Sequence, residues 1–238
     1  MKRSGESATD ASLPALSERI VACRLCPRLV AFREWAAVAK RASFRDWQYW
    51  GRPLPGFGDP RARVVIVGLA PAAHGGNRTG RMFTGDRSGD WLFRSMHRAG
   101  FANQATSVSR DDGLELRDCY ITAAVRCAPP GNRPTTAEFA RCRPYLVREL
   151  ELLDRAKVVV ALGGAAHLAF LRAWKVLGRV APIPAPRFRH GACVRIPPVT
   201  LLDSYHPSQR NTSTGRLTEP MFDAIFRETR SLLDRPTA

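Results

Sequence analysis

A loop rich in glycine and in polar side chains follows the apolar run at residues 64–67. It carries His74, Asn77 and Asp86, which are groups that hold a water molecule or move a proton, and Phe83 is its one large aromatic residue. The glycines let the backbone approach a ligand closely while the polar groups converge on it. We therefore predict a ligand pocket at this loop, and the alternative is a mobile surface loop.

A second polar loop begins at His206 and continues through Gln209, Arg210 and Thr212. It also follows an apolar run, at residues 199–205. In open α/β sheets, ligands bind at the edge formed by the carboxyl ends of the parallel strands. The two polar loops are therefore expected to share one cleft.

Cysteines provide a further set of chemically active groups. Four of the six form one closely spaced pair and two singles, namely Cys23, Cys26, Cys127 and Cys142. Thiolates in this arrangement can surround an iron–sulfur cluster. Zinc is a rival, although structural zinc sites more often use two close pairs, and unrelated buried thiols are a third alternative. Cys119 and Cys193 lie in apolar, strand-like surroundings and are predicted to be inert buried thiols.

These residues must be positioned by strands that alternate with helices. Apolar runs predict buried strands at residues 64–67, 120–125, 157–162 and 199–205. Helical patterns begin at Leu13, with an interruption at residues 23–27, and continue at residues 88–100, about 135–153, from 163 onward and 219–233. Thr135 or Thr136 with Glu138 forms a capping box. The pattern predicts an α/β fold, a three-layer α/β/α sandwich around a central, mostly parallel four-stranded sheet.

Three further segments have less specific patterns. Residues 44–60 are predicted to form a packed irregular loop, because they are rich in aromatics, proline and glycine. The turn at residues 163–164 either holds a phosphate or packs a strand tightly against a helix, and His167 is expected on the helix face. The proline-rich, basic residues 180–191 are predicted to be extended, either as a DNA-facing ribbon or as a connector.

Composition limits the class of protein. The 238 residues form one domain over residues 12–238, and the polar residues 1–11 are predicted to be disordered. The net charge of +16 and the isoelectric point of about 10.8 predict a polyanionic partner, with nucleic acid as the first candidate. There is no apolar stretch long enough for a membrane span and no apolar core of a secretion signal, so we expect a cytoplasmic protein. We also expect a monomer.

Several motifs together resemble the iron–sulfur uracil-DNA glycosylases, and specifically their family 5, also called type b. The motifs are Gly-Leu-Ala-Pro-Ala at 68–72, Gly-Arg-Met-Phe-Thr-Gly-Asp at 80–86, Cys-Ala-Pro-Pro-Gly-Asn at 127–132, and His-Pro-Ser at 206–208 with Asn211. The resemblance extends from about Cys23 to Phe226. It implies an enzyme that flips uracil out of DNA and hydrolyses its N-glycosidic bond, which leaves an abasic site.

The resemblance also implies roles for individual residues. Phe83 matches the aromatic residue that stacks on the flipped base, and His206 matches the histidine placed against the base carbonyl. The residues expected around the substrate are Gly68, Ala70, Pro71, Ala72, Phe83, Ala123, Ser208 and Asn211. Gln209, Arg210 and Thr212 match the loop that enters the DNA minor groove. The four cysteines Cys23, Cys26, Cys127 and Cys142 match the ligands of a [4Fe-4S] cluster, for which we expect a structural role.

Two positions depart from related families. Ala70 stands where most relatives have an aspartate or asparagine that positions the water, and Ala123 stands where they have an asparagine that contacts the uracil edge. We therefore hypothesise catalysis mainly by stabilising the leaving base, with a water held by His74, Asn77 or Asp86. Acceptance of other bases, such as hypoxanthine or ethenocytosine, follows from the same hypothesis. Asp86 has an alternative interpretation, as the cap of the following helix.

Two other classes of function remain open from the sequence. One is a non-catalytic iron–sulfur protein that binds DNA through the same cleft. The other is a metalloprotein that acts on a nucleotide or another phosphate ester, as the glycine-rich loops suggest. The chain contains neither a P-loop pattern nor a dinucleotide-binding fingerprint, so this second class is the less favoured one.

Overall fold

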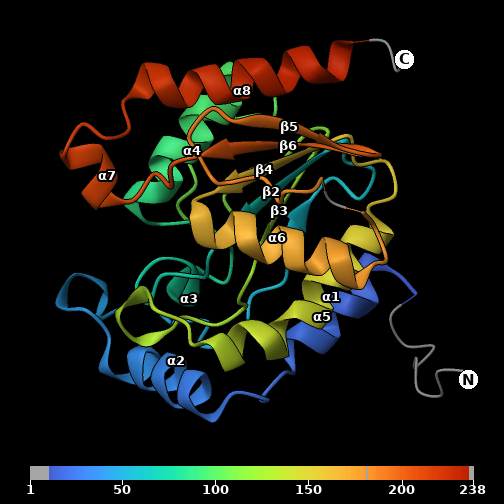
Figure 1. The fold of residues 1–238 in the computed structure, drawn as a ribbon. Helices are drawn as coiled ribbons and strands as arrows, with labels where there is room; N and C mark the ends of the chain where they lie inside the picture. The colour runs from blue at the N-terminus through green and yellow to red at the C-terminus, as the bar shows by residue number, and fades with distance from the viewer. Residues whose placement is uncertain (1–10, 181, 236–238) are drawn as a thin grey trace, which may run out of the picture.

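Six strands form one mixed sheet in the order β1-β3-β2-β4-β6-β5 in a computed structural model that describes residues 11–180 and 182–235 (Figure 1). Their bounds are Phe57–Gly58 (β1), Val64–Gly68 (β2), Cys119–Ala123 (β3), Val158–Leu162 (β4), Cys193–Ile196 (β5) and Val199–Ser204 (β6). The four inner strands are parallel, with Val64 of β2 opposite both Cys119 and Val158. The predicted four-stranded parallel sheet is therefore confirmed.

Two antiparallel edge strands were not predicted. β1 pairs with β3 inside the segment expected to be irregular, and β5 pairs with β6 after the proline-rich stretch. β1 is two residues long and has no pattern to recognise, and β5 is largely exposed, with only Ile196 buried. Cys193 lies on β5 and is exposed, so its predicted burial is wrong, whereas Cys119 on β3 is buried as expected.

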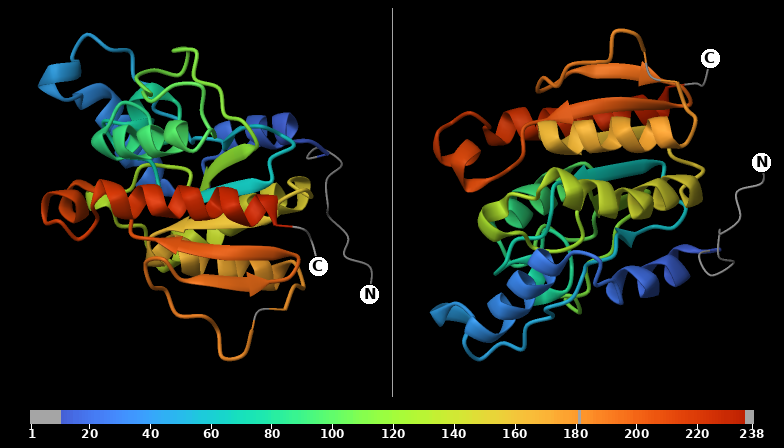
Figure 2. Two further views of the ribbon diagram at one scale, coloured as in Figure 1. Left: turned by 90° about the horizontal axis from the view of Figure 1, so that it is seen from above. Right: turned by 60° about the horizontal axis from the view of Figure 1, so that its bottom comes forward.

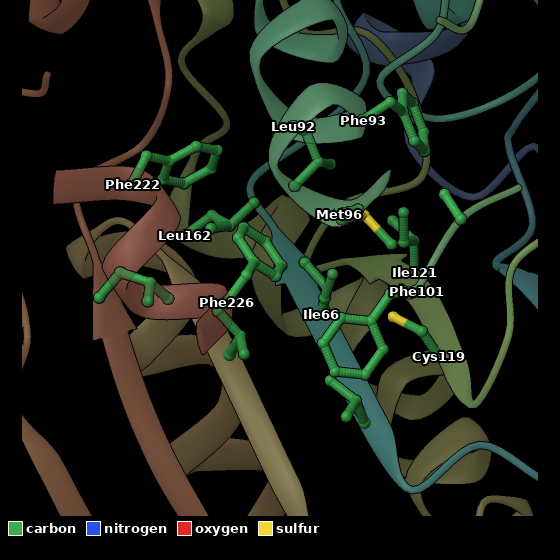
Figure 3. Close-up of a cluster of buried hydrophobic side chains, with 14 of the residues drawn as sticks. Ile66, Leu92, Phe93, Met96, Phe101, Cys119, Ile121, Leu162, Phe222 and Phe226 are labelled. Atoms are coloured by element: carbon green, nitrogen blue, oxygen red, sulfur yellow. The ribbon is translucent and has the colours of Figure 1, made fainter. Parts of the chain in front are cut away.

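Helices cover both faces of the sheet, which confirms the three-layer sandwich (Figures 1 and 2). α4 (Arg87–Arg98) and α8 (Glu219–Asp234) lie on one face. α5 (Thr136–Leu152) and α6 (Gly164–Val176) lie on the other, with α1 (Leu13–Val21) against α5. Figure 3 shows the core under α4 and α8, where Phe101 and Phe226 pack beside Ile66. All five residues of β2 are buried, so the core holds this central strand in place. The loop that follows β2 therefore begins at a fixed position.

Local signals in the sequence explain several helix boundaries. Thr135 caps α5, and Glu138 completes the predicted capping box. α2 (Pro27–Ala39) begins directly after Cys26, with Pro27 in its first turn, so the expected interruption before it is confirmed. The short elements are α3 (Gly76–Thr79), α7 (Gln209–Ser213) and the 3₁₀ turns η2 (Ala42–Phe44) and η3 (Pro130–Asn132).

Three further sequence predictions concern residues 1–11, His167 and membrane-spanning helices. The disorder predicted for residues 1–11 falls, apart from Ala11, outside the described residues. His167 is not on an exposed helix face: it is buried, and its ring nitrogens contact Asp203 Oδ1 at 2.8 Å and the Pro186 carbonyl at 2.9 Å. None of the helices in residues 11–180 and 182–235 is long and apolar enough to cross a membrane.

Candidate active site and cysteine cluster

A cavity of about 450 Å³ opens at the carboxyl edge of the parallel strands. The ends of β2 and β3 form its floor, and the loops after β2 and β6 form its walls, so the two polar loops do share one cleft. Among the residues predicted from the sequence, the lining includes Gly68, Ala70, Pro71, Ala72, Phe83, Asp86, Ala123, His206, Ser208 and Gln209. Strand β3 lies on one side of β2, and β4, which follows it in the chain, lies on the other side. Open α/β sheets bind ligands at such a reversal of strand order.

Phe83 and His206 form the aromatic part of this cavity. Their rings stack with centroids 5.8 Å apart and an interplanar angle of 30°. Phe83 has a backbone φ of +54°, which is strained for a bulky residue. A Cβ on Gly68 would lie 2.9 Å from the Phe83 ring, so only glycine at the end of β2 admits the ring in this position.

The environment of His206 keeps its imidazole neutral. Burial of the ring lowers its pKa from 6.5 to about 4. Asn211 Nδ2 donates to the His206 carbonyl oxygen at 2.8 Å, and Ser208 caps α7, where its hydroxyl accepts from the Asn211 backbone N–H at 3.4 Å. Asn211 is therefore placed as a brace of the His206 loop and is not among the cavity-lining residues.

Asp86 has two structural relationships. It is the N-cap of α4, and its Oδ1 accepts from the Gly89 N–H at 3.0 Å, as the helix-cap interpretation expected. It also lines the cavity, where burial raises the pKa of its carboxyl group above the usual value. A Cβ on Gly75 would lie 2.1 Å from Asp86 Oδ2, so this glycine allows the carboxylate to sit against the loop.

The other two candidates for holding water lie outside the cavity lining. His74 Nδ1 lies 3.1 Å from the Tyr49 hydroxyl, and burial together with the charges of Arg41 and Arg78 lowers the His74 pKa. Asn77 is fully buried, and its Nδ2 donates to the Arg33 carbonyl at 3.1 Å. Of the three candidates, the structure brings only Asp86 to the cavity.

Several lining residues were not named from the sequence. Leu69, Met82, Arg87, Ser88 and Asn132 also line the cavity. Asn132 has a φ of +56° and lies in the turn after β3, at the same sheet edge as the polar loops. In the sequence, Asn132 ends a Pro-Pro-Gly-Asn segment, and this turn pattern is the signal that could have identified the residue.

Next to the cavity, α2 and the loop after β3 present a second group of functional side chains. Cys26, Cys127 and Cys142 are buried in one cluster, and Cys23 packs against it. Arg33 is 2% exposed, and its Nη1 donates to Cys127 Sγ at 2.9 Å. The cysteine pair Cys23 and Cys26 and the two single cysteines, which are far apart in sequence, are therefore neighbours in the fold.

Cysteine ligands hold two kinds of metal group, single ions and iron–sulfur clusters. Within residues 11–180 and 182–235, no group of three or more His, Cys, Asp or Glu side chains is arranged to hold a metal ion. The buried Arg33 guanidinium has a cysteine sulfur as its close partner, while its nearest carboxylate, that of Glu34, is 3.8 Å away. Thiolate-ligated iron–sulfur clusters accept hydrogen bonds at their sulfurs. The contact of Arg33 with Cys127 is compatible with such a cluster.

The surface around the cavity carries the predicted DNA-contact residues. Gln209, Arg210 and Thr212 all lie on α7, and Arg210 is exposed. In Figures 1 and 2, α7 projects from the carboxyl edge of the sheet. The guanidinium of Arg210 is thus free to approach a phosphate.

Comparison with known proteins gives consistent matches. The family model described as the uracil DNA glycosylase superfamily matches residues 55–230. A type-5 uracil-DNA glycosylase of Mycobacterium leprae is 52% identical over 223 residues, which cover 93% of this chain and 96% of the relative. A type-5 uracil-DNA glycosylase of Thermus thermophilus is 49% identical over 219 residues, which cover 92% and 97%. A type-4 uracil-DNA glycosylase of Archaeoglobus fulgidus is 32% identical over 164 residues, which cover 65% and 70%.

Proposed function

The chain belongs to the uracil DNA glycosylase superfamily, and from this premise we propose that it is a DNA repair glycosylase that removes uracil from DNA. The observation that carries the proposal is the cavity in which Phe83 stacks against a neutral His206 beside the carboxyl group of Asp86. A flipped nucleobase needs an aromatic surface to stack on and a donor for its carbonyl oxygen, and this cavity offers both.

Hydrolysis breaks the bond between the base nitrogen and C1′ of the sugar. Negative charge develops on the departing uracil, and its carbonyl oxygen then accepts a hydrogen bond from His206. A neutral imidazole fixed in place before the reaction stabilises that charge at little cost of reorganisation. His206 is thus the residue that makes uracil a better leaving group.

Water supplies the new bond at C1′. Asp86 is the one of the three candidates that lines the cavity, so we assign the water to its carboxylate. Deprotonated Asp86 accepts a proton from the water as its oxygen joins C1′, and the uracil anion takes up a proton after it leaves. Phe83 keeps the base in line during this exchange.

Base selectivity is expected to be broad. Ala70 and Ala123 line the cavity with methyl groups and offer no hydrogen bond to the edge of the base. Because these two positions lack such a group, they do not penalise a base whose edge differs from that of uracil. Hypoxanthine and ethenocytosine are therefore proposed as further substrates.

The cysteine cluster is proposed to hold a [4Fe-4S] group through Cys23, Cys26, Cys127 and Cys142. When bound, the group would cross-link the start of α2, the loop after β3 and α5, and it supplies no electron to the hydrolysis. Arg33 would donate a hydrogen bond to one of its thiolate ligands. We assign the group a structural role, in a monomer that acts in the cytoplasm on damaged DNA.

The proposal is tested with duplex and single-stranded oligonucleotides that carry one uracil, hypoxanthine or ethenocytosine, followed by alkali cleavage at abasic sites. Cleavage that depends on the modified base supports the proposal and ranks the substrates. An undamaged oligonucleotide of the same sequence is the control. Tight DNA binding without release of any base contradicts it and favours a DNA-binding protein without catalytic activity.

A further inference from the structure

Residues 40–48, between α2 and the loop that leads to β1, form a segment that we call the basic arm. It contains Lys40, Arg41 and Arg45 with a single acidic residue, Asp46. In Figures 1 and 2 the arm projects from the same edge of the molecule as α7, and the two lie on opposite sides of the carboxyl edge of the sheet. The cavity opens between them, because the loops after β2 and β6 form its walls.

Arg78 fixes the basic arm to the loop that lines the cavity. Its guanidinium lies between two aromatic rings of the arm, 3.8 Å from the centroid of Phe44 and 4.1 Å from that of Trp47. Arg78 is 3% exposed and donates to the carbonyl oxygens of His74 and Gly85, each at 2.8 Å. Gly85 directly precedes Asp86, so the arm is held at a fixed place relative to the cavity.

A second contact holds the other end of the arm. The Arg41 backbone N–H donates to the Tyr49 hydroxyl at 3.3 Å, and this hydroxyl also contacts His74. The Lys40 ammonium donates to the Arg45 carbonyl at 2.9 Å and closes the arm on itself. These contacts hold the arm in place; Arg41 and Arg45 are exposed, and the Arg45 Nε–H donates to the Ala42 carbonyl oxygen at 3.4 Å.

The charges of the arm lack acidic partners. Arg41 and Arg45 are exposed, and within residues 11–180 and 182–235 neither forms an ion pair; the same holds for Arg210 on α7. A net charge of +16 with unpaired guanidinium groups on both sides of one cavity matches the repeating phosphates of a nucleic acid backbone.

We infer that the basic arm is a second DNA-contact surface, which binds backbone phosphates beside the flipped nucleotide while α7 engages the other side of the lesion. The inference rests on the proposed function for the place of the lesion, but the contact itself requires only that DNA binds. Arg78 acts as a positioning residue that sets the distance between these phosphates and the cavity. Such contacts fix the register of the duplex without reading its sequence.

The test compares the whole protein with the double variant Arg41→Gln, Arg45→Gln in binding to a duplex that carries a tetrahydrofuran abasic analogue. Two lost phosphate contacts reduce the slope of log K against log salt by about 1.8 and weaken binding about tenfold at 0.15 M salt. Hydroxyl-radical footprinting is expected to lose protection on one side of the lesion only. The single-turnover excision rate at saturating DNA is expected to stay unchanged, because neither residue lines the cavity.

The matched control is Arg61→Gln, Arg155→Gln. These two exposed arginines lie before β2 and β4, at the amino end of the strands and far from the cavity, and their loss removes the same charge. An unchanged footprint, or a salt slope equal to that of the control, overturns the inference. Arm-dependent binding without base excision retains the inference and rejects the proposed glycosylase instead.

Discussion

The ring of Phe83 stacks on that of His206, although the two residues belong to different loops at the carboxyl edge of the sheet. Phe83 is thus one of the neighbours of His206, whose burial lowers its pKa to about 4. An aromatic surface and a neutral hydrogen-bond donor are thus parts of one unit. Substitutions at each residue separate the contribution of the aromatic surface from that of the donor.

Replacement His206→Ala is expected to lower the single-turnover excision rate by about 10²–10³-fold, because the departing base loses a fixed donor. Binding to the abasic analogue should change little. His97→Ala is the control, since His97 is exposed on α4. A His206→Ala variant that keeps nearly the full rate would falsify the assigned role.

Stability should depend on pH through His206. Its pKa is about 4 when folded and 6.5 when unfolded, so only the unfolded chain takes up the proton between these values. The free energy of unfolding should therefore fall as the pH decreases from about 6.5 to 4, by at most about 3 kcal/mol, and this part of the loss should end below pH 4. Denaturant titrations of the wild type and of His206→Asn measure the difference, which should vanish if the ring is not desolvated.

Asp86→Asn separates the two roles of Asp86. Asparagine caps a helix as well as aspartate does, so the free energy of unfolding should change by less than about 0.5 kcal/mol. The excision rate should fall about 10²-fold, because an amide does not accept the proton of water. Asp86→Ala should lose about 1 kcal/mol of stability as well. If Asp86→Asn excises at the wild-type rate, the residue is a cap and nothing more.

In wild type, the raised pKa of Asp86 should also set an acid limb of the rate. As the pH falls, the carboxyl group protonates and the rate declines, at a higher pH than for an ordinary aspartate. The limb is measured by single-turnover kinetics across the acid range. The part of this limb that is due to Asp86 should be absent in Asp86→Asn.

Gly68→Ala should displace the Phe83 ring, since the new Cβ would lie 2.9 Å from it. We expect weaker stacking of the flipped base, seen as reduced excision at subsaturating DNA and as an altered signal from 2-aminopurine placed beside the lesion. Gly164→Ala is the matched control, because its Cβ would make an ordinary contact at 3.5 Å. Equal behaviour of the two variants would rule out the steric role of Gly68.

Arg33→Gln should lower the iron content of the purified protein, because it removes the hydrogen bond to Cys127 Sγ. Iron and sulfide analysis and the visible absorbance of the protein measure this without reference to activity. Arg24→Gln is the control, since Arg24 is exposed and pairs with Glu34 at the surface. An undiminished iron content in Arg33→Gln would show that the hydrogen bond does not help to retain the group.

The sequence was sufficient where a signal is local. The β-branched run of β2 and the capping box of α5 each depend on neighbours in the chain, and both were located correctly. Since ligands bind at the carboxyl ends of parallel strands, Phe83 and His206 were then predicted to share one cleft. Strand β1 was missed because two residues carry no periodicity, and its pairing with β3 is a long-range contact.

The positions of His74 and Asn77 were beyond such signals. Both are polar and close in sequence to Asp86, yet His74 contacts Tyr49, Asn77 on the short helix α3 contacts Arg33, and neither lines the cavity. His167 on α6 is likewise buried against Asp203, which lies on strand β6. In each of the three, a partner that is distant in the sequence sets the position of the side chain.

The outer strand β5 has a consequence for the behaviour of the protein in concentrated solution. It spans four residues, carries the exposed Arg195, and is followed by Pro197 and Pro198, which have no N–H to donate. A short, charged edge strand that is followed by prolines is a poor template for pairing with a strand from another molecule. The exposed thiol of Cys193 on the same strand is then the feature by which copies would become cross-linked, so a reducing agent should be enough to keep them apart.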